Sequence, residues 1–247
     1  MGLPDSSLTQ IAPVLYTRDM RFHKKLLLLM LAMGASVCSM LAQDPLQAYP
    51  KNYRLILDND LVSVIRVHYG PHEKVGVHDH SSYPTIYVYL NNSGPVHFVH
   101  DEKPPFEITR PPSVKGAFRV SPGRIERHSV QNLSDLSSDF LRVELKKIPL
   151  NSGLHEFRGK APASLSVIYN VDEFKSPAFD IERVICPSCE VNTGGVPSLY
   201  IAFSPLKLNG HLLKDGDVLW IPDAEMTSVA AASDAPAHLL RIAMKAK

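Results

Sequence analysis

The second half of the chain repeats the first half. Residues 116–122 (Gly-Ala-Phe-Arg-Val-Ser-Pro) match residues 216–222 (Gly-Asp-Val-Leu-Trp-Ile-Pro), and residues 141–146 match residues 240–245 in the same order. Self-similarity at such a long period indicates two copies of one structural unit. Each copy has roughly 90 residues, which is a usual domain size. The chain is therefore expected to fold into two similar domains.

The residue pattern within the copies is that of β-strands. Runs of β-branched and aromatic residues are separated by Gly, Pro, Asn and Asp clusters, and in the first copy they cover residues 53–67, 85–90, 95–100, 118–121 and 140–146. The chain has 20 prolines and shows little helical periodicity after residue 50, which favours strands joined by turns. We expect an all-β fold with domains over residues 52–150 and 164–247 and a polar linker over residues 151–163. Residues 91–94 (Asn-Asn-Ser-Gly) predict a hairpin between two strands.

The N-terminal residues 1–43 have the pattern of an extension that carries a signal peptide. A basic segment at residues 21–25 precedes an apolar segment at residues 26–33, and small residues follow. Met20 is a candidate start of translation. Cleavage is expected between about residues 37 and 45, and an uncleaved membrane anchor is the alternative. The protein is expected to be exported to the periplasm or secreted.

The charge balance excludes some classes of partner. Lys and Arg number 26 against 25 Asp and Glu, so the net charge is +1. Bulk electrostatics would not hold such a protein on nucleic acid or on a membrane surface, and a small molecule is the expected partner. Homodimers are expected through pairing of edge strands.

Two cysteines, Cys186 and Cys189, lie in the expected mature chain as Cys-Pro-Ser-Cys. In an oxidising compartment this spacing is typical of a short-range disulfide or of two unpaired thiols. A zinc ribbon needs a second cysteine pair, and a thioredoxin-like redox motif needs a turn from strand to helix. The sequence has neither pattern, so we favour the first two alternatives.

Histidines are concentrated in the first copy. It contains His68, His72, His78, His80, His97, His100 and His128, whereas the second copy contains only His211 and His238. Side chains alternate along a strand, so His78 and His80 share one face. Neutral imidazole is the commonest ligand for first-row metals, although a polar strand facing solvent would have the same pattern. His97 and His100 have opposite parity, and we expect at least one of them to face solvent.

A second motif follows this pair. Pro122-Gly123 leads into His128-Ser-Val-Gln-Asn132, in which His128 lies 48 residues after His80. Together with Gly76-Val-His-Asp-His80, this segment resembles the two motifs of the cupin superfamily, and the duplicated layout resembles a bicupin. The resemblance implies two tandem double-stranded β-helix (jelly-roll) barrels. In cupins the two motifs lie on adjacent strands, and their histidines meet at one divalent metal.

On this resemblance His78, His80 and His128 would bind one ion of iron, manganese, nickel, copper or zinc. The glutamate ligand of the family has no counterpart, because its position falls on Pro84 or Thr85. Three neutral imidazoles do not offset the charge of a divalent ion, and they leave one to three coordination positions open. Such an ion can bind water, dioxygen or an anionic oxygen ligand.

Three side chains are candidates to compensate for the missing glutamate. Thr85 can contribute only a hydrogen bond. Glu126 shares a face with His128 if that segment is extended, but a glutamate at such a place is expected to point outward. His72 is a further substitute.

Alternation also predicts the wall of a pocket. Thr85, Tyr87 and Tyr89 share one face of their strand, so both tyrosines line the barrel if Thr85 points inward. Tyr87 or Tyr89 would then orient substrate or donate a proton. The alternative is that both are ordinary core aromatics with hydroxyl groups near the barrel mouth.

In the second copy, Val191, Thr193 and Thr227 take the places of the three histidines, so no second metal site is expected. This copy is expected to be structural, with Tyr200 and Trp220 filling its core.

The resemblance implies an exported metal-binding bicupin, with an oxidoreductase of the dioxygenase type as the first functional hypothesis. The alternative is a non-catalytic protein that binds or senses a small molecule or a metal. A third hypothesis is a barrel whose histidines are rim residues and hold no metal. Cupins host many reactions, so the fold alone does not choose among these.

Overall fold

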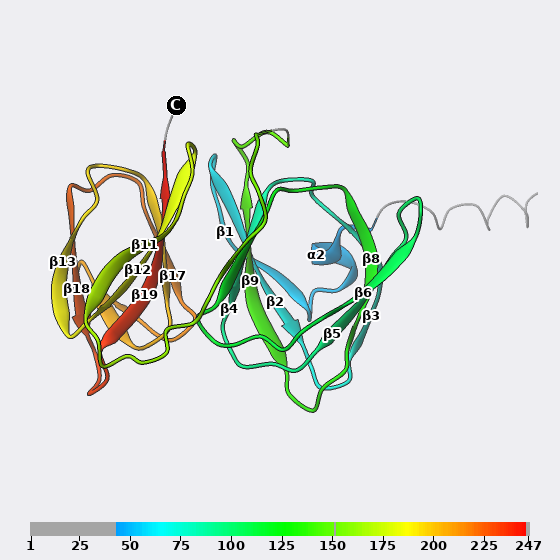
Figure 1. Ribbon diagram of the computed structural model, residues 1–247, viewed down its shortest axis with the longest axis horizontal. Coiled ribbons are helices and arrows are strands. Elements are labelled where there is room, and N and C mark those ends of the chain that lie inside the picture. The colour runs from blue at the N-terminus through cyan, green and yellow to red at the C-terminus, as the bar shows by residue number, and fades with distance from the viewer. Residues whose placement is uncertain (1–42, 151, 246–247) are drawn as a thin grey trace, which may run out of the picture. The chain divides into compact units, whose positions relative to one another are not determined.

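The computed structural model describes residues 43–150 and 152–245 of the chain (Figure 1). The expected signal peptide falls on residues 1–42, outside the described residues. The described part contains one short helix, α2 (Pro45–Ala48), and strands β1 to β19. The side chain of Asp44 accepts a hydrogen bond from the backbone N–H of Leu46 and caps this helix. Within the described residues no helix has the length and apolarity that a membrane span requires.

Two antiparallel sheets form the first barrel. The larger sheet has the order β1 (Tyr53–Asp58), β2 (Val62–Tyr69), β9 (Ser138–Leu145), β4 (Thr85–Tyr89), β7 (Phe118–Ser121), β10 (Phe157–Gly159). The smaller sheet has the order β3 (Lys74–His80), β8 (Glu126–Asn132), β5 (Val96–His100), β6 (Phe106–Arg110). Strand β10 belongs to the expected linker and extends the larger sheet by pairing with β7.

The second barrel repeats this topology. One sheet has the order β11 (Tyr169–Lys175), β12 (Phe179–Cys186), β19 (Ala237–Met244), β14 (Ser198–Ala202), β17 (Val218–Ile221). The other has the order β13 (Ser188–Asn192), β18 (Met226–Ala231), β15 (Leu206–Leu208), β16 (His211–Leu213). Apart from β10, which has no counterpart, each strand of the first barrel corresponds to the strand of the second whose number is higher by ten, so the sequence repeat is a structural repeat.

Two sequence expectations about strands are wrong. The run at residues 53–67 forms two strands, because Asn59 accepts hydrogen bonds from the N–H groups of Leu61 and Val62 and makes a turn. The predicted hairpin at residues 91–94 does not form. Strand β4 pairs with β7 and β9, whereas β5 pairs with β6 and β8 in the other sheet. The segment is a connection between sheets.

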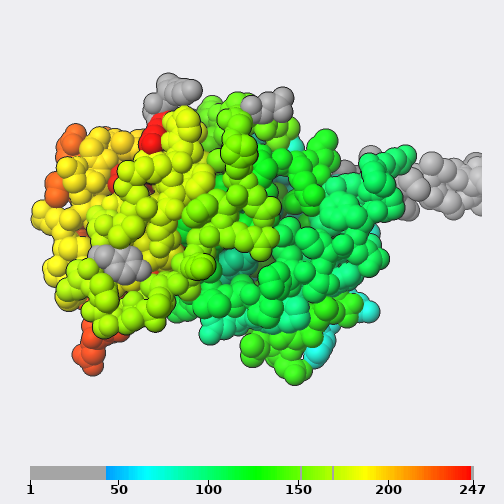
Figure 2. Space-filling model, in the orientation of Figure 1, coloured from blue at the N-terminus to red at the C-terminus, as the bar shows by residue number. Residues whose placement is uncertain are grey.

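Apolar side chains of both barrels share one buried cluster. Val64, Ile86 and Val143 of the first barrel belong to it together with Ile181, Leu199 and Ile242 of the second, and each of these is at most 1% exposed. Across this contact the buried guanidinium of Arg183 donates a hydrogen bond to the carbonyl of Gly116 at 2.8 Å. The first copy (blue to green) and the second (yellow-green to red) are in direct contact in Figure 2.

The two barrel interiors differ in composition. The first is lined by aromatic rings, among them Tyr53, Tyr69 and Phe140. The second is filled mainly by aliphatic side chains such as Leu206, Leu208 and Leu239. Tyr200 lies in this second core, and Trp220 packs instead against the cluster shared by the barrels. The aromatic interior therefore belongs to the copy with the histidines.

Cys186 and Cys189 form a disulfide. The bond closes the turn between β12 and β13, and Cys186 is buried in the core of the second barrel. Of the alternatives left open by the spacing, the structure therefore contains the short-range disulfide.

Candidate metal centre and cavity of the first barrel

Three histidines converge inside the first barrel. His78 and His80 lie on β3, and His128 lies directly opposite His78 on the neighbouring strand β8. Their ring centroids are 4.7 to 5.0 Å apart, and one nitrogen from each ring lies within 4.8 Å of the others. Among the described residues no other group of three or more His, Cys, Asp and Glu side chains has a geometry that could hold a metal ion.

A bulge in β3 aims the first histidine. The register between β3 and β8 shifts between Val75 and His78, at the position of Gly76. A Cβ at Gly76 would overlap the hydroxyl of Tyr49, so glycine allows the segment after α2 to pack against the strand. The carbonyl of Gly76 lies 2.8 Å from Nδ1 of His78 and accepts its proton. This tautomer leaves the lone pair on Nε2, which faces Nε2 of His80 at 3.0 Å.

His128 is a buried imidazole without a hydrogen-bond partner. It is 4% exposed, and neither Nδ1 nor Nε2 contacts a donor or acceptor within the described part of the chain. Burial lowers the pKa of His128 to about 3, so the ring is neutral. Burial also lowers the pKa values of His78 and His80. Three neutral, converging imidazoles, one of them unsatisfied, fit a single divalent metal ion.

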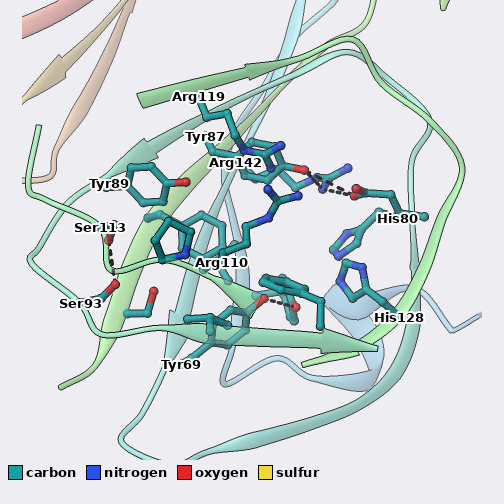
Figure 3. Close-up of a pocket in the computed structure, with 18 of the residues that line it drawn as sticks. Tyr69, His80, Tyr87, Tyr89, Ser93, Arg110, Ser113, Arg119, His128 and Arg142 are labelled. Carbon is teal, nitrogen blue, oxygen red and sulfur yellow. Dashed lines mark hydrogen bonds and ion pairs between the residues drawn. The ribbon is translucent and has the colours of Figure 1, made fainter. Parts of the chain in front are cut away.

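His80 and His128 lie at one side of a cavity inside the barrel (Figure 3). The cavity has about 670 Å³ of empty volume, part of which is open to solvent. Tyr87 and Tyr89 line it, as the alternation of their strand predicts, while Ile86 and Val88 face the cluster shared by the barrels. Thr85 is buried and donates to the carbonyl of Tyr83. Its hydroxyl is therefore engaged away from the histidines.

Glu126 points inward, so the expectation that it faces solvent is wrong. It is 6% exposed and lines the cavity, with ion pairs to Arg142 at 3.1 Å and to Arg124 at 3.2 Å. Burial by itself raises the pKa of a carboxyl group, but the charge of Arg142, the charge of Arg124 and the hydrogen bond from Arg142 lower that of Glu126 to about 2. The two arginines provide the neutralisation that a buried carboxylate needs.

Solved structures similar to this chain share little sequence with it. The bacterial pirin YhhW from Escherichia coli, in complex with nickel(II), is 14% identical with a TM-score of 0.56, over 79% of this chain and 91% of that one. YhaK from Escherichia coli is 12% identical with a TM-score of 0.54, over 79% and 92%. AerE from Microcystis aeruginosa is 14% identical with a TM-score of 0.53, over 79% and 98%.

At these identities the likeness concerns the fold. The chain has the bicupin fold. No protein-family model matches the sequence, and no curated protein matches it either.

The second barrel has no histidines at the corresponding place. Val191 pairs with Thr227 across β13 and β18, as His78 pairs with His128 across β3 and β8. The hydroxyl of Thr227 is hydrogen-bonded to that of Tyr200 at 3.0 Å. The place of the histidine pair is therefore occupied by an apolar residue and a satisfied hydroxyl.

Two features of the cavity could not be foreseen from the local sequence pattern. Arg142 on β9 donates to the hydroxyl of Tyr87 at 2.9 Å and also pairs with Glu144 at 2.9 Å. The signal was an arginine and a glutamate at alternate positions of the otherwise apolar stretch 140–145. The second feature is His100, which is buried next to His128 and stacks on Phe106. His97, which lies on the other face of the same strand, is hydrogen-bonded to Thr109 near the surface.

Proposed function

We propose that the first barrel binds one divalent transition-metal ion through His78, His80 and His128, and that the protein is an oxidoreductase of the dioxygenase type acting on a small organic molecule. The observation that carries this proposal is the buried His128, whose two nitrogens have no partner although the lone pair of His78 points to the same space. An unsatisfied buried polar group is costly unless a ligand completes it.

The metal would supply Lewis acidity and open positions for oxygen ligands. The protein would supply the surroundings. Aromatic rings such as Tyr69, Phe98 and Phe140 line the cavity and exclude water. Burial raises the pKa of Tyr87, so its hydroxyl stays protonated near neutral pH. Arg142 donates to this hydroxyl, which itself donates a long hydrogen bond of 3.4 Å to Glu126. A bound molecule would take the place of Glu126 as the acceptor of the hydrogen bond or proton from Tyr87.

Export is part of the same proposal. It is supported by the basic and apolar segments at residues 21–33 and by the disulfide between Cys186 and Cys189, since disulfides persist mainly in oxidising compartments. Fractionation of cells that express the native full-length chain tests this part. Recovery of the protein only in the cytoplasm, at full length, would contradict it.

The metal site is tested on the full-length chain, expressed without a histidine tag and purified without chelators. Mass spectrometry should find about one transition-metal ion per chain. His78→Ala and His128→Ala should each lose it while remaining folded by circular dichroism. His97→Ala, on the outward side of β5, is the matched control and should keep the metal. Full metal content in either of the first two variants would overturn the site.

Oxygen uptake then separates the two functional hypotheses. The loaded protein is screened with small aromatic and aliphatic molecules in an oxygen electrode. Metal-dependent consumption with one of them supports the dioxygenase. One observation favours a role in binding or sensing. Glu126 forms ion pairs with two arginines and is therefore not free to act as a base. Tight ligand binding without oxygen consumption would support that role.

A further inference from the structure

We propose that the cavity of the first barrel binds a small organic anion, a carboxylate with a planar apolar body, through the guanidinium groups of Arg110 and Arg119. This inference deepens the proposed function, because it names the class of substrate for the same cavity. It rests on arginine side chains in this cavity that have no carboxylate partner among the residues that line it.

The positive charges in the cavity exceed the negative ones. Arg110, Arg119 and Arg142 all line it, and Glu126 is the one carboxylate among the lining residues. Arg142 is neutralised by Glu126 and Glu144. Glu126 also forms an ion pair with Arg124. No carboxylate of the lining is therefore left for Arg110 or Arg119.

Arg119 is buried with an unmet donor. It is 7% exposed, and its Nε has no hydrogen-bond partner within the described residues. Its one ion pair is a long contact of 3.8 Å to Glu156, which is half exposed and closer to Arg158 at 3.1 Å. The guanidinium stacks over the ring of Tyr87, 4.2 Å from its centroid. Stacking holds the group in place and leaves its N–H edge available.

Arg110 adds a second free guanidinium. Within the described part of the chain it forms no ion pair and no hydrogen bond through its side chain, and it lies over the ring of Phe98 at 5.8 Å. Both guanidinium groups line the same cavity, and burial together with the charge of Arg119 lowers the pKa of Arg110. In Figure 3 Arg110 and Arg119 project into the same space, with Tyr89 beside them and His80 and His128 farther along the cavity.

Two like charges brought together in a partly desolvated cavity repel each other, and an anion relieves this repulsion. Guanidinium groups match a carboxylate with paired N–H donors, which makes arginine the preferred residue for this ligand. The rest of the lining is mostly aromatic and aliphatic, with Tyr69, Tyr89, Phe98 and Phe140 as its aromatic rings, and the hydroxyl groups of Ser93 and Ser113 in it are hydrogen-bonded to each other. A flat apolar body fits between such rings, and a highly hydroxylated molecule would leave its polar groups unsatisfied there.

The test uses benzoate as the probe and benzamide as a neutral probe of the same shape. Isothermal titration calorimetry on the full-length, metal-loaded protein at low salt should detect benzoate, with benzamide at least tenfold weaker. Arg110→Gln and Arg119→Lys should each weaken benzoate at least tenfold and leave benzamide unchanged. Arg54→Gln, an exposed position on β1, removes the same charge and should have no effect.

Acetate and inorganic phosphate are added as smaller anions. The proposal is overturned if none of the three anions binds below about 10 mM, or if folded Arg110→Gln binds benzoate as the unmodified protein does. If Arg119→Lys does not fold, Arg110→Gln decides alone, because its side chain is only partly buried. Metal content is measured on the same samples. Metal present without anion binding refutes this inference alone, and anion binding in a protein without metal refutes the metal centre alone.

Discussion

The hydroxyl of Tyr53 lies 2.8 Å from Nε2 of His78 and 2.7 Å from the hydroxyl of Tyr69. Because Nδ1 of His78 donates to the carbonyl of Gly76, Nε2 is the nitrogen with the lone pair, and Tyr53 donates to it. One lone pair cannot serve a hydrogen bond and a metal at once. Tyr53 is therefore expected to compete with the metal for His78.

Tyr53→Phe should strengthen metal binding. Removing one hydrogen bond worth about 1 kcal/mol corresponds to a gain of roughly fivefold in affinity, measured by competition with a metal-binding dye. Tyr49→Phe is the control, since Tyr49 contacts the edge of the His78 ring at a centroid distance of 5.6 Å. A weaker metal affinity in Tyr53→Phe would instead identify its hydroxyl as a ligand.

Glu126→Gln should destabilise the protein and keep the metal. The substitution leaves Arg142 and Arg124 without one of their carboxylates, and loss of one partner of a buried pair costs about 3 kcal/mol. Urea unfolding measures this loss. Glu156→Gln, at an exposed ion pair, should cost less than about 1 kcal/mol. Loss of the metal from folded Glu126→Gln would show that this carboxylate replaces the missing glutamate ligand.

His238 should make the protein less stable in acid. Burial, with the charges of Arg183 and Lys115, lowers its pKa to about 3, and Nε2 accepts a hydrogen bond from Arg183 at 2.8 Å. In the unfolded chain the group regains the usual pKa of about 6.5. As pH falls below that value the unfolded state takes up the proton first, so stability present at pH 7 is lost toward pH 3.

The contribution of His238 is measured against His238→Gln, which keeps a hydrogen-bond acceptor but does not titrate. Between pH 6 and 4 the unmodified protein should lose up to about 1.4 kcal/mol per pH unit more than the variant in urea unfolding. If the free energy of unfolding of the two proteins changed with pH in the same way, His238 would take up its proton in the folded state as readily as in the unfolded state, and its pKa would not be lowered.

The disulfide should stabilise the second barrel without influencing the metal. Cross-linking so short a loop is worth about 2 kcal/mol in the chain-entropy model. The double variant Cys186→Ser/Cys189→Ser should therefore unfold at a lower urea concentration with unchanged metal content, since both cysteines belong to the second barrel. A loss of metal on reduction would reveal coupling between the barrels.

Local patterns predicted much of the candidate site. Alternation correctly placed Tyr87 and Tyr89 in the cavity and put His78 and His80 on one face. The repeat correctly matched Val191 and Thr227 with His78 and His128, because both pairs lie opposite each other across equivalent strands. The same reasoning failed at residues 91–94, since a turn signal does not say to which sheet the next strand belongs.

The sequence by itself determined the duplication, the all-β architecture and the set of histidines, because these depend on repetition and on the two-residue period of a strand. Only the tertiary structure decided that Glu126 points inward and that Arg110 and Arg119 face a cavity without a carboxylate of their own. The partners of Glu126 include Arg142, which lies 16 residues away in the other sheet. The free energy of burying a charge depends on such distant groups, which assemble only when the two sheets close into a barrel.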